Sequence, residues 1–287
     1  MNRIARSQFL KPVLIFLVAL QLAGCSAGDL FLDRHGLADR IGATAGFVKT
    51  LVKAEPFLLT AYHRIAAPGE ALTVYIEGDG QAWLSRSRLA TDPTPTDPVA
   101  LRLAALDPSP NVVYLARPCH YTDPRLDPSC RPAYWSNKRF AREVIAAMDQ
   151  AVEQFQRRSR AREVHLVGYS GGGAVATLIA ARRRDVASLR TVAGNLDHVT
   201  LNRHKRVSPL TGSLNPIDFA PTLSRLPQHH FVGSGDRVVP RFIAEAFARR
   251  AASSRCIGVT VVEDVSHAKG WVERWLDLLT MPVACSG

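Results

Sequence analysis

The chain has 287 residues, of which 47% are hydrophobic and 21% are charged. This length and composition allow one sizeable hydrophobic core, so we expect a single folded domain. The net charge of +11 comes mainly from arginines that are spread along the chain. No aromatic residues alternate with them and no nucleic-acid motif accompanies them, so we expect solvated helix ends rather than a nucleic-acid-binding surface. Attraction to anionic lipid head groups is the alternative interpretation.

The first 24 residues have the three parts of a secretory signal. Residues 1–11 are basic, residues 13–20 are apolar, and Leu22-Ala23-Gly24 precedes Cys25. The apolar run is short for a membrane-spanning helix, which needs about 20 residues. Residues 1–24 are therefore predicted to be a signal peptide.

The sequence Leu22-Ala23-Gly24-Cys25 resembles the lipobox of bacterial lipoproteins. That resemblance implies cleavage before Cys25, a diacylglycerol on its sulfur and a further acyl chain on its amine. Several acyl chains give stable membrane anchoring, where one would be marginal. Ser26 follows the cysteine in place of the Asp that favours inner-membrane retention in that family, so we expect the outer membrane, on its periplasmic side. An uncleaved anchor and an ordinary secreted protein are the alternatives.

Residues 25–55 are expected to form a tether that leads into a folded domain at residues 56–287. Apolar residues recur at helical spacing in this segment, at Leu37, Ile41, Ala45, Val48 and Val52. Glycines interrupt the pattern and weaken it. Packing of this helix on the domain is the favoured interpretation, and a helix lying on the membrane is the alternative.

The remaining elements alternate between strands and helices. Short apolar runs predict strands at residues 57–65, 72–77, 111–116, 164–167, 189–193, 229–232 and 257–262. Helical patterns occupy residues 138–158, 174–184, 241–252 and 272–279. Residues 81–110, 117–135 and 208–227 are rich in Pro and are expected to be loops. This alternation predicts an α/β fold of three layers, with helices on both faces of a mostly parallel sheet.

Four cysteines remain if Cys25 is lipidated, and an oxidising compartment favours their pairing into structural disulfides. Four cysteines allow three pairings. Proximity in the sequence favours Cys119 with Cys130, which leaves Cys256 for Cys285. No C-x-x-C spacing and no His/Cys cluster indicates a metal site, so we expect none.

A serine lies between a predicted strand and a predicted helix. Residues 168–172 read Gly-Tyr-Ser-Gly-Gly, with Ser170 at the centre of a G-x-S-x-G pattern. A serine at such a tight strand-to-helix turn is typical of a nucleophile elbow. The free N–H groups of the following helix suit a developing oxyanion. A glycine-flanked serine in an ordinary turn is the alternative.

A serine nucleophile needs a general base, and the base needs a carboxylate that orients it. Asp236 follows the strand predicted at residues 229–232, and His267 follows the strand predicted at residues 257–262. In a parallel sheet such residues meet beyond the carboxyl ends of the strands. His198 is the rival candidate for the base, and Asp197 and Asp264 are the rival candidates for the carboxylate. Asp236 itself has a second interpretation, in which it only caps its turn.

With the order Ser170, Asp236, His267 the chain resembles the α/β-hydrolase family over nearly all of residues 56–287. The resemblance rests on the elbow, on Gly233-Ser234-Gly235-Asp236-Arg237-Val238-Val239-Pro240, and on Ser266-His267 before a terminal helix. It implies that Ser170 is the nucleophile, that His267 is a general base and then a general acid, and that Asp236 orients His267. It implies no cofactor and no metal.

The resemblance also implies an oxyanion hole made by the Gly171 amide and an amide in the loop after an early strand. That loop is Glu77-Gly78-Asp79-Gly80, where Glu77 stands in place of the His found in many members. The Asp79 amide is the expected second donor, with Gly80 or Gln81 as alternatives. The Asp79 side chain must then face away, because a carboxylate in the hole would repel the oxyanion.

These features predict a lipid-anchored serine hydrolase of the cell envelope that cleaves an ester or related acyl bond of a small-molecule substrate. A peptidase or an acyltransferase with the same triad is one alternative. A non-catalytic envelope-binding lipoprotein that keeps only the fold is the other. The aromatic residues Trp83, Trp135 and Tyr169 are expected to pack or to line the rim of the site.

Overall fold

The computed structural model describes residues 33–251 and 254–285. The predicted signal peptide and Cys25 lie outside the described residues. A compact unit begins at Arg34. Its helices are α2 (Arg34–Thr44), α3 (Val99–Leu106), α4 (Arg142–Ser159), α5 (Gly171–Ala180), α6 (His198–Lys205), α7 (Phe242–Arg250) and α8 (Trp271–Thr280).

The strands form one sheet with the order β1-β2-β4-β3-β5-β6-β7-β8. They are β1 (Val48–Ala54), β2 (Phe57–Ile65), β3 (Leu72–Ile76), β4 (Asn111–Leu115), β5 (Val164–Tyr169), β6 (Val186–Val192), β7 (Gln228–Gly233) and β8 (Ile257–Val262). The first two pairings, β1 with β2 and β2 with β4, are antiparallel, and all later ones are parallel. The mostly parallel sheet is confirmed.

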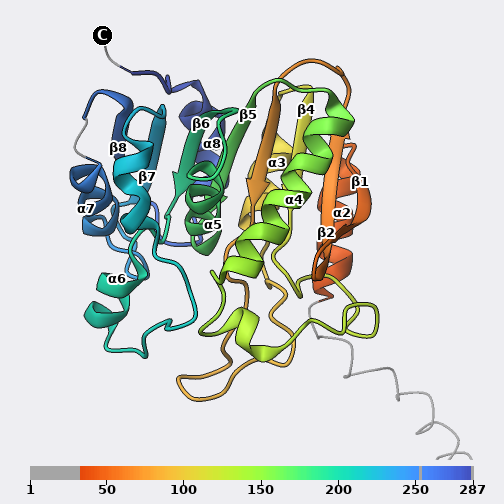
Figure 1. The fold of residues 1–287 in the computed structure, drawn as a ribbon, viewed down its shortest axis with the longest axis horizontal. Coiled ribbons are helices and arrows are strands. Elements are labelled where there is room, and N and C mark those ends of the chain that lie inside the picture. Colours follow the sequence, from red (N-terminus) through yellow and green to blue (C-terminus); the bar gives the residue numbers. More distant parts are fainter. Residues whose placement is uncertain (1–32, 252–253, 286–287) are drawn as a thin grey trace, which may run out of the picture. The chain divides into compact units, whose positions relative to one another are not determined.

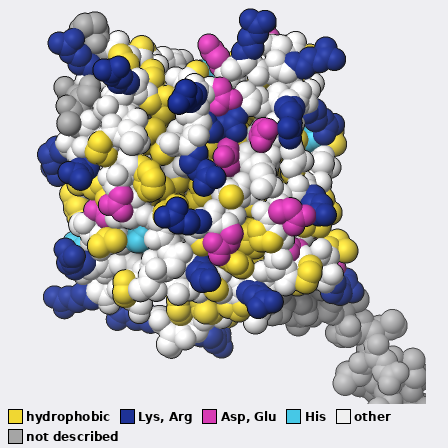
Figure 2. All heavy atoms as spheres, in the orientation of Figure 1, with side chains coloured by type: hydrophobic (Ala, Val, Ile, Leu, Met, Phe, Trp, Pro, Cys, Tyr) yellow, Lys and Arg dark blue, Asp and Glu magenta, His cyan; other side chains and the backbone are white. Residues whose placement is uncertain are grey.

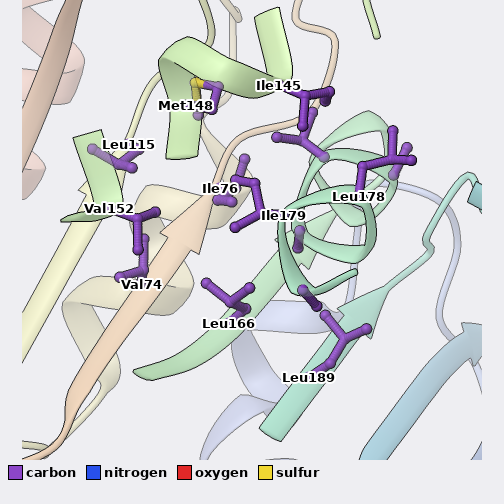
Figure 3. Packing of buried hydrophobic residues seen from close by; sticks show 14 of the residues in the cluster. Val74, Ile76, Leu115, Ile145, Met148, Val152, Leu166, Leu178, Ile179 and Leu189 are labelled. Carbon is purple, nitrogen blue, oxygen red and sulfur yellow. The ribbon is translucent and has the colours of Figure 1, made fainter. Parts of the chain in front are cut away.

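Helices cover both faces of this sheet, which gives three layers (Figure 1). One core lies between the sheet and the helices α4, α5 and α7. The other lies between the sheet and the helices α2, α3 and α8. In Figure 3, Ile145, Met148 and Val152 of α4 face apolar side chains of β3 and β4. The strands β3 and β4 are buried along their whole length because both faces are covered.

The expected tether over residues 25–55 is wrong from Arg34 onward. The helical stripe ends at Thr44, because the chain turns at Gly46 with a φ of 69°. Val48 and Val52 lie instead on β1, where they pair with His63 and Leu59 of β2. The strand thereby extends the sheet, so the folded domain starts near residue 34 and not at residue 56.

Two helices were not expected from the sequence. The helix α3 lies in the segment 81–110, which was predicted to be a loop, and five of its eight residues are buried. Seven of its eight residues are apolar, which weakens the one-sided periodicity by which surface helices are found. The helix α6 follows β6, and the Asp197 side chain caps it by accepting a hydrogen bond from the Thr200 amide at 3.1 Å.

The remaining sequence predictions concern the cysteines and the surface. Disulfides join Cys119 to Cys130 and Cys256 to Cys285, which confirms the pairing favoured by proximity. None of the helices within the described residues combines the length and hydropathy needed to cross a bilayer. Figure 2 shows Lys and Arg side chains scattered over one face with Asp and Glu between them, which fits a solvated surface.

Candidate active site

The strand β5 ends directly before Ser170, and α5 begins directly after it. Ser170 has a φ of 51° and a ψ of −119°, a strained conformation for a residue with a Cβ. Neighbouring strands hold this turn in place. The Ser170 amide donates to the Val192 carbonyl at 2.9 Å, and the Ser170 carbonyl accepts from the Asn195 amide at 2.9 Å. The sequence therefore folds locally as a nucleophile elbow.

A close approach of α5 to the sheet depends on glycine. A Cβ on Gly172 would overlap the backbone carbonyls of Ile76 and Glu77 at the end of β3. All ten residues of α5 are buried. The start of this helix is thus pressed against the loop after β3, and its unpaired N–H groups lie beside Ser170.

The structure brings Ser170, His267 and Asp236 together. Ser170 Oγ lies 3.0 Å from His267 Nε2, and His267 Nδ1 lies 2.8 Å from Asp236 Oδ2. The Asp236 side chain is fully buried. Its second oxygen accepts hydrogen bonds from the amides of Val238 and Val239 at 2.7 and 2.9 Å. Asp236 therefore caps its own turn and contacts the imidazole at the same time.

Two aromatic side chains fix the backbone of His267. The Tyr169 hydroxyl donates to the His267 carbonyl at 3.1 Å, and the Trp271 indole N–H donates to it at 2.8 Å. Burial raises the pKa of the Tyr169 phenol, which keeps the hydroxyl protonated. The sequence predicts this role for neither residue. The spacing of Trp271, one turn after His267 at the start of α8, is the only available signal.

The rival residues lie in other arrangements. His198 Nε2 lies 3.1 Å from the Leu214 carbonyl, within hydrogen-bonding distance. Asp197 caps α6 and accepts a hydrogen bond from Asn215 at 2.9 Å. Asp264 is exposed, and its amide donates to Ser234 Oγ at 3.1 Å. Of the candidate carboxylates, Asp236 is the one that contacts His267.

The amides of the loop after β3 differ in whether they have an acceptor. The Gly78 amide donates to the Glu77 carboxyl at 2.9 Å, and the Gln81 amide donates to the Pro93 carbonyl at 2.9 Å. Among the described residues, the amides of Asp79 and Gly80 have no acceptor within hydrogen-bonding distance. The alternative of Gln81 as a donor is therefore disfavoured, and Asp79 or Gly80 remains beside Gly171.

The Asp79 carboxylate does not face away from the elbow. It lies against Gly171, where it occupies the place that a Cβ on that glycine would take. Its oxygens bind two guanidiniums, Arg117 at 3.2 Å and Arg139 at 2.7 Å. Burial by itself would raise the pKa of Asp79, but the charges of Arg139 and Arg117 outweigh it and lower the pKa. The cluster of one acid and two arginines keeps a net positive charge beside Ser170.

These arginines are functional candidates that no sequence pattern indicates. Arg117 follows β4 and Arg139 precedes α4, so neither lies near the elbow in the sequence. Both belong to segments expected to be loop or helix start, where an arginine carries no distinguishing signal. The pairing of β3 with β4 brings Arg117 to Asp79, and the segment before α4 brings Arg139 to it.

Glu77 anchors the same loop from its buried side. Its carboxyl accepts hydrogen bonds from the Gly78 amide and from the Ala100 amide in the first turn of α3, at 2.9 and 3.4 Å. Burial raises the pKa of Glu77 to about 7, in spite of these hydrogen bonds. Glu77 therefore replaces the side-chain cap that Pro98 does not give to α3.

A cavity of about 470 Å³ opens over Ser170 and His267. Trp83, Tyr169, Asp79 and Arg139 are among its walls. The expectation that these aromatic residues pack or line the site is confirmed: Trp83 and Tyr169 line the cavity. Trp135 is packed in a small apolar cluster, and its indole donates to the Ala90 carbonyl at 3.0 Å. Within residues 33–251 and 254–285, no group of three or more His, Cys, Asp and Glu side chains is arranged to hold a metal ion.

Neither the known family models nor the curated proteins contain a match to this chain. Among solved structures, an esterase from Pyrococcus furiosus is 11% identical over 81% of this chain and 89% of its own, with a TM-score of 0.56. Est1E from Butyrivibrio proteoclasticus is 12% identical over 80% of this chain and 95% of its own, with a TM-score of 0.56. A bacterial membrane phospholipase A is 16% identical over 94% of this chain and 98% of its own, with a TM-score of 0.53.

These similarities establish the fold. The chain has the α/β-hydrolase fold, with an eight-stranded, mostly parallel sheet between two layers of helices.

Proposed function

We propose that this protein is a serine hydrolase that cleaves ester bonds through an acyl-enzyme on Ser170. The observation that carries the proposal is the continuous chain of hydrogen bonds from Ser170 Oγ through His267 to the buried Asp236. The order of these residues and the strained elbow support it further. Structural neighbours described as esterases and as a phospholipase act on bonds of the same class.

In the proposed acylation step, Ser170 Oγ attacks the carbonyl carbon while His267 Nε2 takes its proton. The Asp236 carboxylate accepts the hydrogen bond from His267 Nδ1–H, which fixes the tautomer and stabilises the imidazolium that forms. His267 then gives the proton to the leaving alcohol oxygen as the acyl C–O bond breaks. A water molecule, deprotonated by the same nitrogen, releases the acid and restores Ser170.

The oxyanion of each tetrahedral intermediate would accept hydrogen bonds from the Gly171 amide and the Asp79 amide. Each such donor contributes on the order of 10²–10³ in rate, and proton transfer through the base contributes about 10²–10⁴. The net positive charge of Asp79, Arg117 and Arg139 supports the same function, since it offsets the repulsion that the Asp79 carboxylate would exert on the oxyanion.

We also propose that Cys25 carries the lipid anchor and holds the enzyme at the outer membrane. The support is the lipobox-like Leu22-Ala23-Gly24-Cys25 after a basic and apolar leader. Mass spectrometry of the N-terminal peptide after expression in a bacterium tests it. We expect an acylated peptide that begins at Cys25 and a Cys25→Ser variant without the acyl mass; an unmodified mature N-terminus in the wild type would contradict the anchor.

Fluorophosphonate labelling of the full-length protein in detergent, with mapping of the labelled peptide, tests the catalytic proposal. We expect a label on Ser170 that disappears in Ser170→Ala and in His267→Ala. Ser109→Ala is the matched control, because Ser109 precedes β4 and Ser170 follows β5, so the two serines lie at opposite ends of the parallel strands. Folded protein that takes no label would overturn the proposal, and faster turnover of peptides than of p-nitrophenyl esters would assign the triad to a peptidase.

A further inference from the structure

A second cavity, of about 1070 Å³, lies next to the cavity over Ser170. The two cavities share Trp83 and Arg139 as walls. The second cavity lies between the loop after β3 and the segment that follows α6. Its remaining walls include Arg86, Leu89, Arg206 and Val207. A substrate held at Ser170 therefore has room to extend past Arg139 into this space.

The charge of this second cavity is entirely positive. Arg86, Arg139 and Arg206 line it, and no Asp or Glu is among its lining residues. Within residues 33–251 and 254–285, no partner is found for the guanidiniums of Arg86 and Arg206. Arg183, by contrast, binds Asp149 and Asp185 at 2.8 and 2.7 Å. The cavity thus holds two guanidiniums whose hydrogen-bond donors are free for a ligand.

Arginines arranged in this way suit a phosphate group. The planar guanidinium presents a fork of N–H donors that matches two phosphate oxygens, and its charge persists at every physiological pH. Arg139 is already held by Asp79 at 2.7 Å and by the Ser136 carbonyl at 2.8 Å, so its position is fixed between the two cavities. The other walls over Ser170 include Val99, Val238 and Ala268, which suit an apolar acyl chain.

We propose that the second cavity binds a phosphate on the alcohol part of the ester, so that the substrate class is an acyl ester of a phosphorylated alcohol. This inference rests on the proposed function. The acyl carbonyl lies at Ser170, and the alcohol extends past Trp83 and Arg139 toward Arg86 and Arg206. Water adds across the acyl C–O bond, which yields a carboxylic acid and the phosphorylated alcohol, whose oxygen receives the proton from His267.

A matched pair of substrates tests the inference on the full-length protein in detergent. The pair is a monoacylglycerol and the corresponding acylglycerol 3-phosphate, with the same short acyl chain. We expect kcat/KM to favour the phosphorylated ester by about tenfold or more, since a hydrogen bond to a charged group contributes about 1.5–3 kcal/mol. The advantage should lie mainly in KM. An acylglycerol hemisuccinate, whose anion is a carboxylate, should show a smaller increase in kcat/KM over the monoacylglycerol than the phosphate does.

The double variant Arg86→Gln/Arg206→Gln should lower the ratio of the two kcat/KM values about tenfold. The matched control is Arg249→Gln/Arg250→Gln, which removes the same charge from the last turn of α7. It should leave the ratio unchanged. A control that lowers the ratio as much would overturn the inference, because it would show a general charge effect. A hemisuccinate as good as the phosphate would overturn the assignment to phosphate.

Direct binding separates this inference from the proposed function. Calorimetry should show glycerol 3-phosphate binding to the Ser170→Ala protein and at least tenfold weaker binding after the Arg86→Gln/Arg206→Gln changes are added. Equal kcat/KM for both esters, in a protein that labels at Ser170, would overturn the phosphate site and leave the hydrolase proposal intact. Absence of labelling together with tight glycerol 3-phosphate binding would overturn the hydrolase proposal and leave the phosphate site intact.

Discussion

Two acidic side chains flank Ser170, and their surroundings differ. Asp236 follows β7 in a tight turn and binds two backbone amides and the His267 ring. Asp79 follows β3 and binds two guanidiniums, Arg117 and Arg139. The Asp236 side chain is 0% exposed, and the Asp79 side chain is 20% exposed.

The difference shows that two carboxylates in one site can have different roles, one in catalysis and one in holding the structure. The charge of Asp236 is balanced only by dipoles and by an imidazole, so it is available to stabilise an imidazolium as it forms. The charge of Asp79 is exceeded by two arginines, so the carboxylate serves to hold those arginines beside the loop after β3. We therefore expect substitutions at Asp236 to change mainly the rate and those at Asp79 to change mainly the stability.

Asp236→Asn should give the largest effect. The amide keeps an oxygen for the Val238 and Val239 N–H groups, but its NH₂ group favours the wrong tautomer of His267. We expect kcat for ester hydrolysis to fall by about 10⁴ with little change in melting temperature. Steady-state kinetics and thermal unfolding measure both. A fall of less than tenfold would mean that Asp236 is only a turn cap.

Asp79→Asn should lower the stability more than the rate. Removing the acid leaves Arg117 and Arg139 beside each other without their shared partner, and breaking a buried ion pair costs roughly 3–5 kcal/mol. We expect the free energy of unfolding to fall by about this amount, while kcat of the folded protein falls less than in Asp236→Asn. Denaturant unfolding and kinetics on the same samples compare the two. An unchanged stability would contradict the structural role of the cluster.

Glu77→Gln tests how the buried carboxyl of the same loop makes the stability of the protein depend on pH. The pKa of Glu77 is about 7 in the folded protein against 4.5 for the free group. Because the folded state binds this proton more tightly, the stability that Glu77 contributes is complete below pH 4.5 and is lost as the pH rises through 7. We expect Glu77→Gln to gain about 3 kcal/mol relative to the wild type between these limits.

Denaturant unfolding of the wild type and Glu77→Gln from pH 4.5 to pH 8 measures this gain. Glu263→Gln, an exposed site on the surface, is the matched control and should run parallel to the wild type. A constant difference between the wild type and Glu77→Gln across this range would show that burial does not hold the proton on Glu77.

Gly171→Ala should give the smallest effect. The new Cβ would lie 2.0 Å from Asp79 Oδ1, so the Asp79 carboxylate or the start of α5 must shift. We expect kcat to fall about tenfold, equivalent to about 1.4 kcal/mol. In a double-mutant cycle the penalty should shrink when Asp79→Ala is also present. Strictly additive penalties would mean that the two residues do not interact.

The sequence alone determined the parts of this protein that depend on neighbours along the chain. The elbow at Ser170 needs only a strand, a glycine-flanked serine and a helix in succession, so the local sequence pattern was sufficient to predict it. The order of strands and helices likewise predicted the three layers. Asp236 and His267 were identified because each follows a predicted strand, and the parallel direction of those strands places their ends together.

Tertiary structure alone decided the features that depend on contacts between distant segments. Val48 reads equally well as part of a helical stripe, and only pairing with β2 makes it part of a strand. Seven of the eight residues of α3 are apolar and five are buried, so little periodicity marks this helix. Asp79 meets Arg117 because β3 and β4 lie side by side, and it meets Arg139 because the segment before α4 returns to the same loop. A single chain records neither which strands are neighbours nor which charges they bring together, because that choice is made by the packing of the whole sheet.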